Sequence, residues 1–180
     1  LTGGQKDNAI TRECIAEFLT DSVAEVKAYA KELQEQLREE YTGSDENITF
    51  EITEKGTATA EVLHPTSQEK IVFYLQNVPF GIQKMSGTIK GLVETSSNIG
   101  ILRLDRDELF ASSSVRSSVD AACSALSDKI EYLTEFLGGD YEVQGAYPAW
   151  EYRKEIVTSP SNWRLIATTT RITHQERQTR

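Results

Sequence analysis

Apolar residues recur along the first third of the chain with two different periods. Between residues 22 and 41 they lie three and four positions apart with charged residues between them, which predicts an amphipathic helix. Ser22 and Glu25 have the spacing of a capping box at the start of this helix. Within residues 10–19 and 48–53, apolar residues recur two positions apart, so that their side chains would lie on one face of an extended chain. This pattern is typical of strands. We therefore expect a strand, a helix and a second strand.

A second short helix is predicted near the middle of the chain. Thr66 and Glu69 form another capping box directly after Pro65, and the apolar pattern continues to about residue 76. We expect this helix to bury three apolar residues, which are Ile71, Val72 and Leu75. Residues 77–91 are rich in glycine and proline and are predicted to form a loop. The apolar residues expected to anchor this loop are Phe80, Ile82 and Met85.

The next part of the chain predicts a hairpin, a helix and a strand. Residues 99–104 and 109–115 are apolar runs separated by a polar turn, which indicates two antiparallel strands. Ser117 or Ser118 is positioned to cap a helix that ends at the glycines 138 and 139. The apolar stripe of this helix consists of Ala122, Leu126, Ile130, Leu133 and Leu137. Tyr141 and Val143 indicate a last strand.

These elements predict an α+β fold with antiparallel sheets and helices packed on one face. The elements that follow Asn8-Ala9-Ile10 and Asn98-Ile99-Gly100 resemble each other, which is a weak internal repeat with a spacing of 90 residues. This repeat predicts two ferredoxin-like halves, of which the first is incomplete. Residues 154–180 show no amphipathic period and carry a basic excess. We expect this tail to be divergent and poorly ordered.

Composition limits the classes of function. The chain has 180 residues with a net charge of −9, which disfavours nucleic acid and anionic membranes as partners. It has no apolar run long enough for a membrane span, and we expect a cytoplasmic protein. Cys14 and Cys123 do not form a disulfide framework, and both are expected to be buried, inert thiols.

Few residues carry obvious catalytic chemistry. The sequence lacks a phosphate-binding loop, a nucleophile elbow and an HExxH motif, and His64 is expected to be a solvated loop residue. Asn8 follows a flexible pair of glycines, where its side chain is available to a ligand or satisfies a turn. Arg116 lies among serine residues. Its guanidinium could bind the carboxylate of a ligand through two parallel hydrogen bonds, or it could form an ion pair with a neighbouring Asp or Glu.

Several runs of sequence, in order along the chain, resemble one known family. They are residues 3–13 (GGQKDNAITRE), 79–86 (PFGIQKMS), 91–98 (GLVETSSN), 115–119 (VRSSV) and 145–150 (GAYPAW). These runs resemble the lid-domain segments of bacterial Xaa-His dipeptidases, also called aminoacyl-histidine dipeptidases, which are dizinc metallopeptidases of the M20 clan. Thr11 departs from the family pattern, which has proline there, and the likeness ends after residue 153.

The resemblance implies a role for residues 1–153 as a lid or dimerisation-type domain that is incomplete on its N-terminal side. It implies that Asn8 and Arg116 bind the substrate and that Arg116 binds the substrate's C-terminal carboxylate. It implies more weakly that Asn98 makes a further polar contact with the substrate. The implied partners are a dipeptide, the catalytic domain of the parent enzyme and, in addition, a second copy in a homodimer. The family's two zinc ions are held by catalytic-domain motifs that this sequence lacks, so no metal ligand and no catalytic residue is expected here.

Two hypotheses follow from the sequence. The first is the lid of a cytosolic dizinc dipeptidase that hydrolyses Xaa-His and similar dipeptides, inactive as this fragment. The second is a freestanding α+β module that binds a small ligand or a protein through its sheet face and has no catalytic activity.

Overall fold

The computed structural model describes residues 1–57, 60–105, 108–146, 164–173 and 177–179. The chain divides into two compact units, each considered by itself below. Unit 1 comprises Leu1–Glu17 and Leu63–Gln178, and unit 2 comprises Phe18–Val62 and Thr179–Arg180. The expected domain boundary at residue 153 lies outside the described residues.

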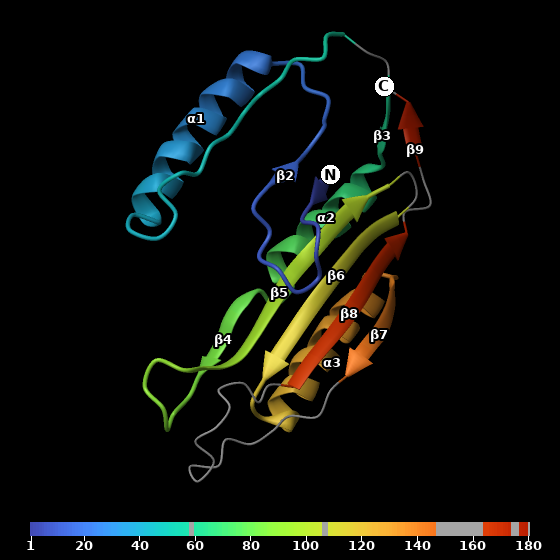
Figure 1. Ribbon diagram of the computed structural model, residues 1–180. Helices are drawn as coiled ribbons and strands as arrows, with labels where there is room; N and C mark the ends of the chain where they lie inside the picture. Colours follow the sequence, from blue (N-terminus) through green and yellow to red (C-terminus); the bar gives the residue numbers. More distant parts are fainter. Residues whose placement is uncertain (58–59, 106–107, 147–163, 174–176, 180) are drawn as a thin grey trace. The chain divides into compact units, whose positions relative to one another are not determined.

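Unit 1 is built on one antiparallel sheet with the strand order β2-β1-β5-β6-β8-β7, and β4 pairs with another part of β5 (Figure 1). Its strands are β1 (Thr2–Gly3), β2 (Cys14–Ile15), β4 (Gly81–Met85), β5 (Val93–Leu104), β6 (Glu108–Ser117), β7 (Asp140–Ala146) and β8 (Arg164–Thr173). The hairpin of β5 and β6 forms the centre of the sheet and is longer than the apolar runs predict. The residues that extend β5 beyond its predicted run include Thr95, Ser96, Ser97 and Asn98, whose polar side chains interrupt the apolar alternation.

Two helices, α2 (Pro65–Asn77) and α3 (Asp120–Phe136), pack on one face of this sheet (Figure 1). The core joins both helices to β6. It consists of Ile71, Tyr74, Val78, Leu109, Ala111, Val115, Cys123, Leu126, Ile130 and Leu137. Each fully buried large apolar side chain contributes about 1.5–3 kcal/mol relative to an exposed one. The structure therefore confirms the α+β class with helices on one sheet face.

The ends of these helices differ from the predicted caps. His64, not Thr66, is the N-cap of α2, and its Nδ1 accepts a hydrogen bond from the Thr66 backbone N at 3.3 Å. Helix α3 begins after Val119 without a side-chain cap bond, and Ser117 Oγ accepts from the Val119 backbone N instead. The expectation that His64 is a solvated loop residue was wrong, because this half-buried imidazole caps the helix.

Unit 2 contains helix α1 (Val23–Glu40), which starts where the capping box predicts. Ser22 Oγ accepts from the Glu25 backbone N at 3.4 Å. Residues 48–53, predicted as a strand, form none. Instead the Ile48 carbonyl accepts from Arg38 Nε and the Phe50 backbone N donates to Gln34 Oε1, so this segment bonds to helix side chains rather than to a neighbouring strand. No residue of α1 is fully buried.

Several other local predictions were wrong. Residues 10–19 form only the two-residue strand β2, and Cys14 on it is exposed rather than buried; Cys123 is buried as expected. The predicted loop contains β4, because pairing with β5 supplies the backbone hydrogen bonds that the local sequence does not indicate. The apolar residues expected to anchor this loop are exposed. Val72 and Leu75, which were expected to be buried, are also exposed, and Tyr74 and Val78 belong to the core instead.

Strand β8 lies between β6 and β7, within the stretch that we expected to be poorly ordered. All ten of its residues pair with β6. Its Thr168-Thr169-Thr170 run lacks an amphipathic period but has high strand propensity, which a neighbouring strand on each side stabilises. A separate two-stranded sheet is formed by β3 (Glu61–Leu63) and β9 (Arg177–Thr179).

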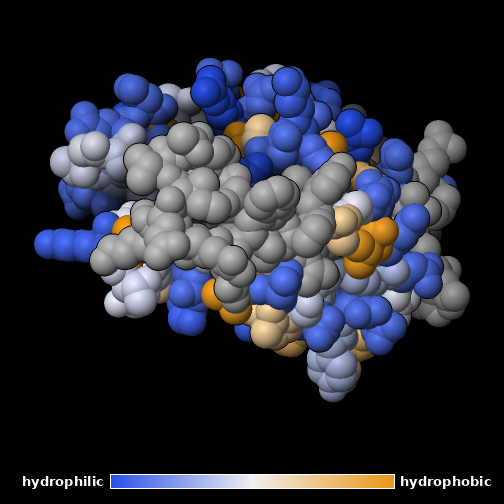
Figure 2. All heavy atoms as spheres, turned by 60° about the horizontal axis from the view of Figure 1, so that its bottom comes forward, coloured by the Kyte–Doolittle hydropathy of each residue, from blue (hydrophilic) through white to orange (hydrophobic). Residues whose placement is uncertain are grey.

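The surface is mixed in character. On the described part of the face shown in Figure 2, the exposed hydrophobic residues form small separate patches that are surrounded by hydrophilic residues. The described helices include none that is both long and apolar enough to cross a bilayer.

Candidate functional site

The two faces of β6 have different surroundings. Leu109, Ala111 and Val115 belong to the core under the helices, so the odd-numbered residues of β6 face α2 and α3. The even-numbered residues therefore lie on the opposite face, which we call the open face. Its members on β6 include Phe110, Ser112, Ser114 and Arg116.

The strand register brings two of the three sequence-predicted site residues together on the open face. Asn98 of β5 lies directly opposite Ser114 of β6, and Ser96 lies directly opposite Arg116. Asn98 and Arg116 are therefore diagonal neighbours across the strand pair, at a separation that long side chains span. Arg116 is exposed and Asn98 is half-buried.

The N-terminal segment, residues 4–11, crosses the same part of β5 (Figure 1). A Cβ atom at Gly100 would lie 2.2 Å from the Lys6 carbonyl oxygen, and one at Gly4 would lie 1.9 Å from the Gly100 carbonyl oxygen. Gly4 has φ +72°, which glycine adopts without strain. The two backbones are thus in direct contact, at the point where a register shift interrupts the β5–β6 pairing between Ile99 and Ile101.

Two side-chain hydrogen bonds hold this segment on β5. Asn98 Nδ2 donates to the Ala9 carbonyl at 2.8 Å, and Thr11 Oγ1 donates to the Ile99 carbonyl at 3.1 Å. Thr11 occupies the position at which the resemblance expects proline, which has no hydroxyl to make such a bond. The sequence did not predict this role for Asn98, which links the segment carrying Asn8 to the strand pair carrying Arg116.

Asn8 lies in a turn of that segment. The Ala9 backbone N donates to the Lys6 carbonyl at 3.3 Å, and the Asn8 backbone N donates to Asp7 Oδ1 at 2.9 Å. It is therefore the Asp7 side chain that accepts from the turn backbone, while Asn8 is exposed. The structure brings the segment of Asn8 onto the strand that carries Asn98, with Arg116 on the adjacent strand.

Sequence reasoning missed one residue of this face. Ser114 is 3% exposed, and its Oγ has no hydrogen-bond partner among the described residues. A buried hydroxyl without a partner costs about 1–3 kcal/mol. The signal that could have identified Ser114 is its position two residues before Arg116 on a predicted strand, which places both side chains on one face.

The chemistry of this face is that of binding. Among the described residues, Arg116 forms no ion pair with a carboxylate, and its guanidinium carries five N–H donors. Guanidinium and amide groups together suit a carboxylate and a peptide group. No three His, Cys, Asp or Glu side chains of the described residues come together as a metal site.

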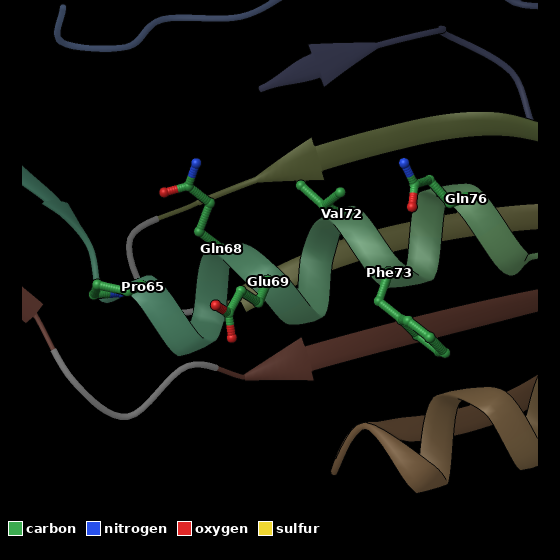
Figure 3. A pocket seen from close by; sticks show the side chains of 6 residues that line it. All are labelled: Pro65, Gln68, Glu69, Val72, Phe73 and Gln76. Atoms are coloured by element: carbon green, nitrogen blue, oxygen red, sulfur yellow. The ribbon is translucent and has the colours of Figure 1, made fainter.

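A shallow pocket of about 450 Å³ lies elsewhere, on the surface of α2. Figure 3 shows Gln68, Val72 and Gln76 projecting from one side of the helix, and Glu69 and Phe73 from another. The remaining lining residue is Pro65. Among the described residues that line this pocket, the one charged side chain is that of the acid Glu69, and none is a cation that could hold a carboxylate. The open face is therefore the better candidate.

Comparison with known proteins finds one relative with a described activity. The chain is 27% identical over 151 residues to the cytosol non-specific dipeptidase of Escherichia coli (strain K12). The alignment covers 83% of this chain and 31% of the relative, so the chain spans about a third of the relative's length. No protein-family model matches the chain, and no solved structure does. The chain is thus related to part of a dipeptidase.

Proposed function

We propose that this chain is the lid domain of a dipeptidase and that its open face binds the dipeptide substrate. One observation carries this proposal: Arg116 is exposed on the same sheet face as Asn98, and Asn98 holds the segment that presents Asn8. The similarity to a dipeptidase over most of the chain supports it independently.

The three residues have separate roles in this proposal. Arg116 binds the C-terminal carboxylate, because its planar fork matches the two carboxylate oxygens. The exposed Asn8 amide contacts the polar backbone of the dipeptide. Asn98 keeps the N-terminal segment in place and supplies a further polar contact when the substrate is bound. Substrates of the Xaa-His type, with free carboxylates, fit this arrangement.

The hydrolytic step belongs, in this proposal, to a catalytic domain of a longer cytoplasmic parent enzyme, which assembles as a homodimer. Two zinc ions held by that domain would activate the attacking water. The described residues of this chain do not fit such ions, because their metal-ligating side chains form no cluster. The contribution of this chain is therefore to bind and orient the substrate and to exclude water on closure.

Binding of dipeptides to the purified chain tests the proposal. We expect an Xaa-His dipeptide to shift the amide resonances of residues around Arg116 in a nuclear magnetic resonance titration, and its C-terminal amide derivative to bind more weakly. Arg116→Ala should weaken binding by about 10- to 100-fold, the range for one lost charge-assisted interaction. Arg103→Ala is the matched control, because Arg103 is exposed on the same face opposite Phe110.

Equal loss of affinity in the two arginine variants would contradict the assignment of Arg116, since it would show a general effect of positive charge. Equal affinity for the free dipeptide and its amide would contradict carboxylate recognition. Binding of ligands unrelated to peptides, with no response to dipeptides, would favour the freestanding module instead.

A further inference from the structure

Ser113 and Ser114 are adjacent residues with the same local chemistry but opposite surroundings. Ser113 is 1% exposed and Ser114 is 3% exposed, and both hydroxyls lack a hydrogen-bond partner among the described residues. Ser113 faces the helices, together with the core residues Ala111 and Val115. Ser114 lies on the open face, directly opposite Asn98.

Ser114 is also close to the proposed carboxylate-binding group. Two residues of a strand span about 7 Å, and they point to the same side. The Arg116 side chain is long enough to lean along the strand over that distance. A carboxylate has about four lone-pair sites, so one that is gripped by a guanidinium still accepts a hydrogen bond from a hydroxyl.

We propose that Ser114 is a substrate-contacting residue whose hydroxyl donates to the carboxylate held by Arg116. This inference rests on the proposed function and adds a residue to its site. An unpaired buried hydroxyl is unfavourable in the free chain, and a bound carboxylate supplies the missing acceptor. Because Ser114 Oγ is closed off from solvent, neighbouring side chains must move apart before a ligand reaches it.

The test compares Ser114→Ala with Ser113→Ala in the same chain. Both variants remove a buried, unpaired hydroxyl, so we expect similar urea midpoints for the two. Ser114→Ala should weaken binding of an Xaa-His dipeptide about tenfold, which corresponds to about 1.4 kcal/mol. It should leave binding of the C-terminal amide derivative unchanged. Ser113→Ala should change neither affinity, and Ser114→Thr, which keeps the hydroxyl, should restore part of the loss.

Each result separates this inference from the proposed function. Unchanged carboxylate binding in Ser114→Ala, with the Arg116→Ala loss intact, overturns the role of Ser114 and leaves the lid proposal standing. Equal losses in the Ser113 and Ser114 variants also overturn it, because they indicate a structural effect. A wild-type chain that binds no dipeptide overturns the proposed function and this inference together. If Ser114→Ala does not fold, Ser114→Cys replaces it, and an unchanged preference for the carboxylate then overturns the role.

Discussion

The backbones of the N-terminal segment and β5 meet at Gly100 without room for a side chain. A Cβ atom there would lie 2.2 and 2.3 Å from the carbonyl oxygens of Lys6 and Asp7, which are backbone atoms that no rotamer change moves. Glycine at this position is therefore what lets the segment carrying Asn8 lie on the strand.

We predict that Gly100→Ala displaces this segment and lowers the free energy of unfolding by about 1–3 kcal/mol, as overpacking does. Urea denaturation measures the stability, and the rate of proteolysis within residues 4–11 measures the displacement. Gly145→Ala is the matched control, because it is also a strand glycine and its added Cβ would meet nothing within 4 Å. Similar losses in the two variants would contradict the close contact.

The fold changes the ionisation of Tyr141, which is half-buried on β7. Burial raises the pKa of its phenol, and hydrogen bonds with Ser127 and Thr168 partly oppose this rise. Its hydroxyl and Ser127 Oγ lie 2.6 Å apart. The folded chain thus holds the phenolic proton more tightly than the unfolded chain, whose tyrosines have a pKa of about 10.

This shift predicts a pH-dependent effect of Tyr141→Phe. Since the folded pKa is raised, the stabilisation by Tyr141 is fully present below about pH 10 and falls as the pH rises through the folded pKa. At pH 8 the variant should lose about 0.5–1.5 kcal/mol, the net value of one hydrogen bond. The difference from wild type in urea denaturation should shrink above about pH 10; a difference independent of pH would refute the argument.

At the scale of elements, the helices owe their positions to a few fully buried residues. Ile130 of α3 is 0% exposed within the core, whereas Tyr132 on the same helix is 71% exposed and stacks on Phe136. Periodicity predicted this difference, because Ile130 belongs to the apolar stripe and Tyr132 does not. The buried and exposed positions of α3 can be predicted from the sequence, because the apolar and polar faces of a helix are formed by residues three and four positions apart.

Ile130→Ala should lower the free energy of unfolding by about 2–5 kcal/mol, because it leaves a cavity between α3 and the sheet. Tyr132→Ala should cost less than about 1 kcal/mol, since it removes one exposed ring contact. Thermal or urea unfolding of both variants checks this pair. An equal cost would show that α3 is not packed as described.

For the whole molecule, the proposed function separates binding from hydrolysis. We expect the purified chain, supplied with zinc and an Xaa-His dipeptide, to bind the peptide without cleaving it, because the described residues provide no cluster of metal ligands. Chromatographic analysis of the free amino acids measures cleavage. Zinc-dependent release of histidine that a chelator stops would contradict the division of roles.

The sequence by itself determined the elements whose signal is local. The capping box at Ser22, the apolar stripe of α3 and the hairpin of β5 and β6 each depend on residues near one another in the chain. It also identified Asn8, Asn98 and Arg116 as candidates through residue type and resemblance. It could not identify β4 or β8, or exclude the strand predicted at residues 48–53, because strand formation depends on a partner that is distant in sequence.

Only the tertiary structure decided how the candidate residues relate to one another. Asn98 and the carbonyl of Ala9 are 89 positions apart in sequence, and their hydrogen bond exists because Gly4 and Gly100 allow two backbones to touch. Likewise, Ser113 and Ser114 are the same residue type, and the packing of the helices on β6 places Ser113 toward the helices and Ser114 on the open face with Arg116. Local patterns follow from short-range sterics and hydrophobicity, whereas the site depends on register and close packing between distant segments.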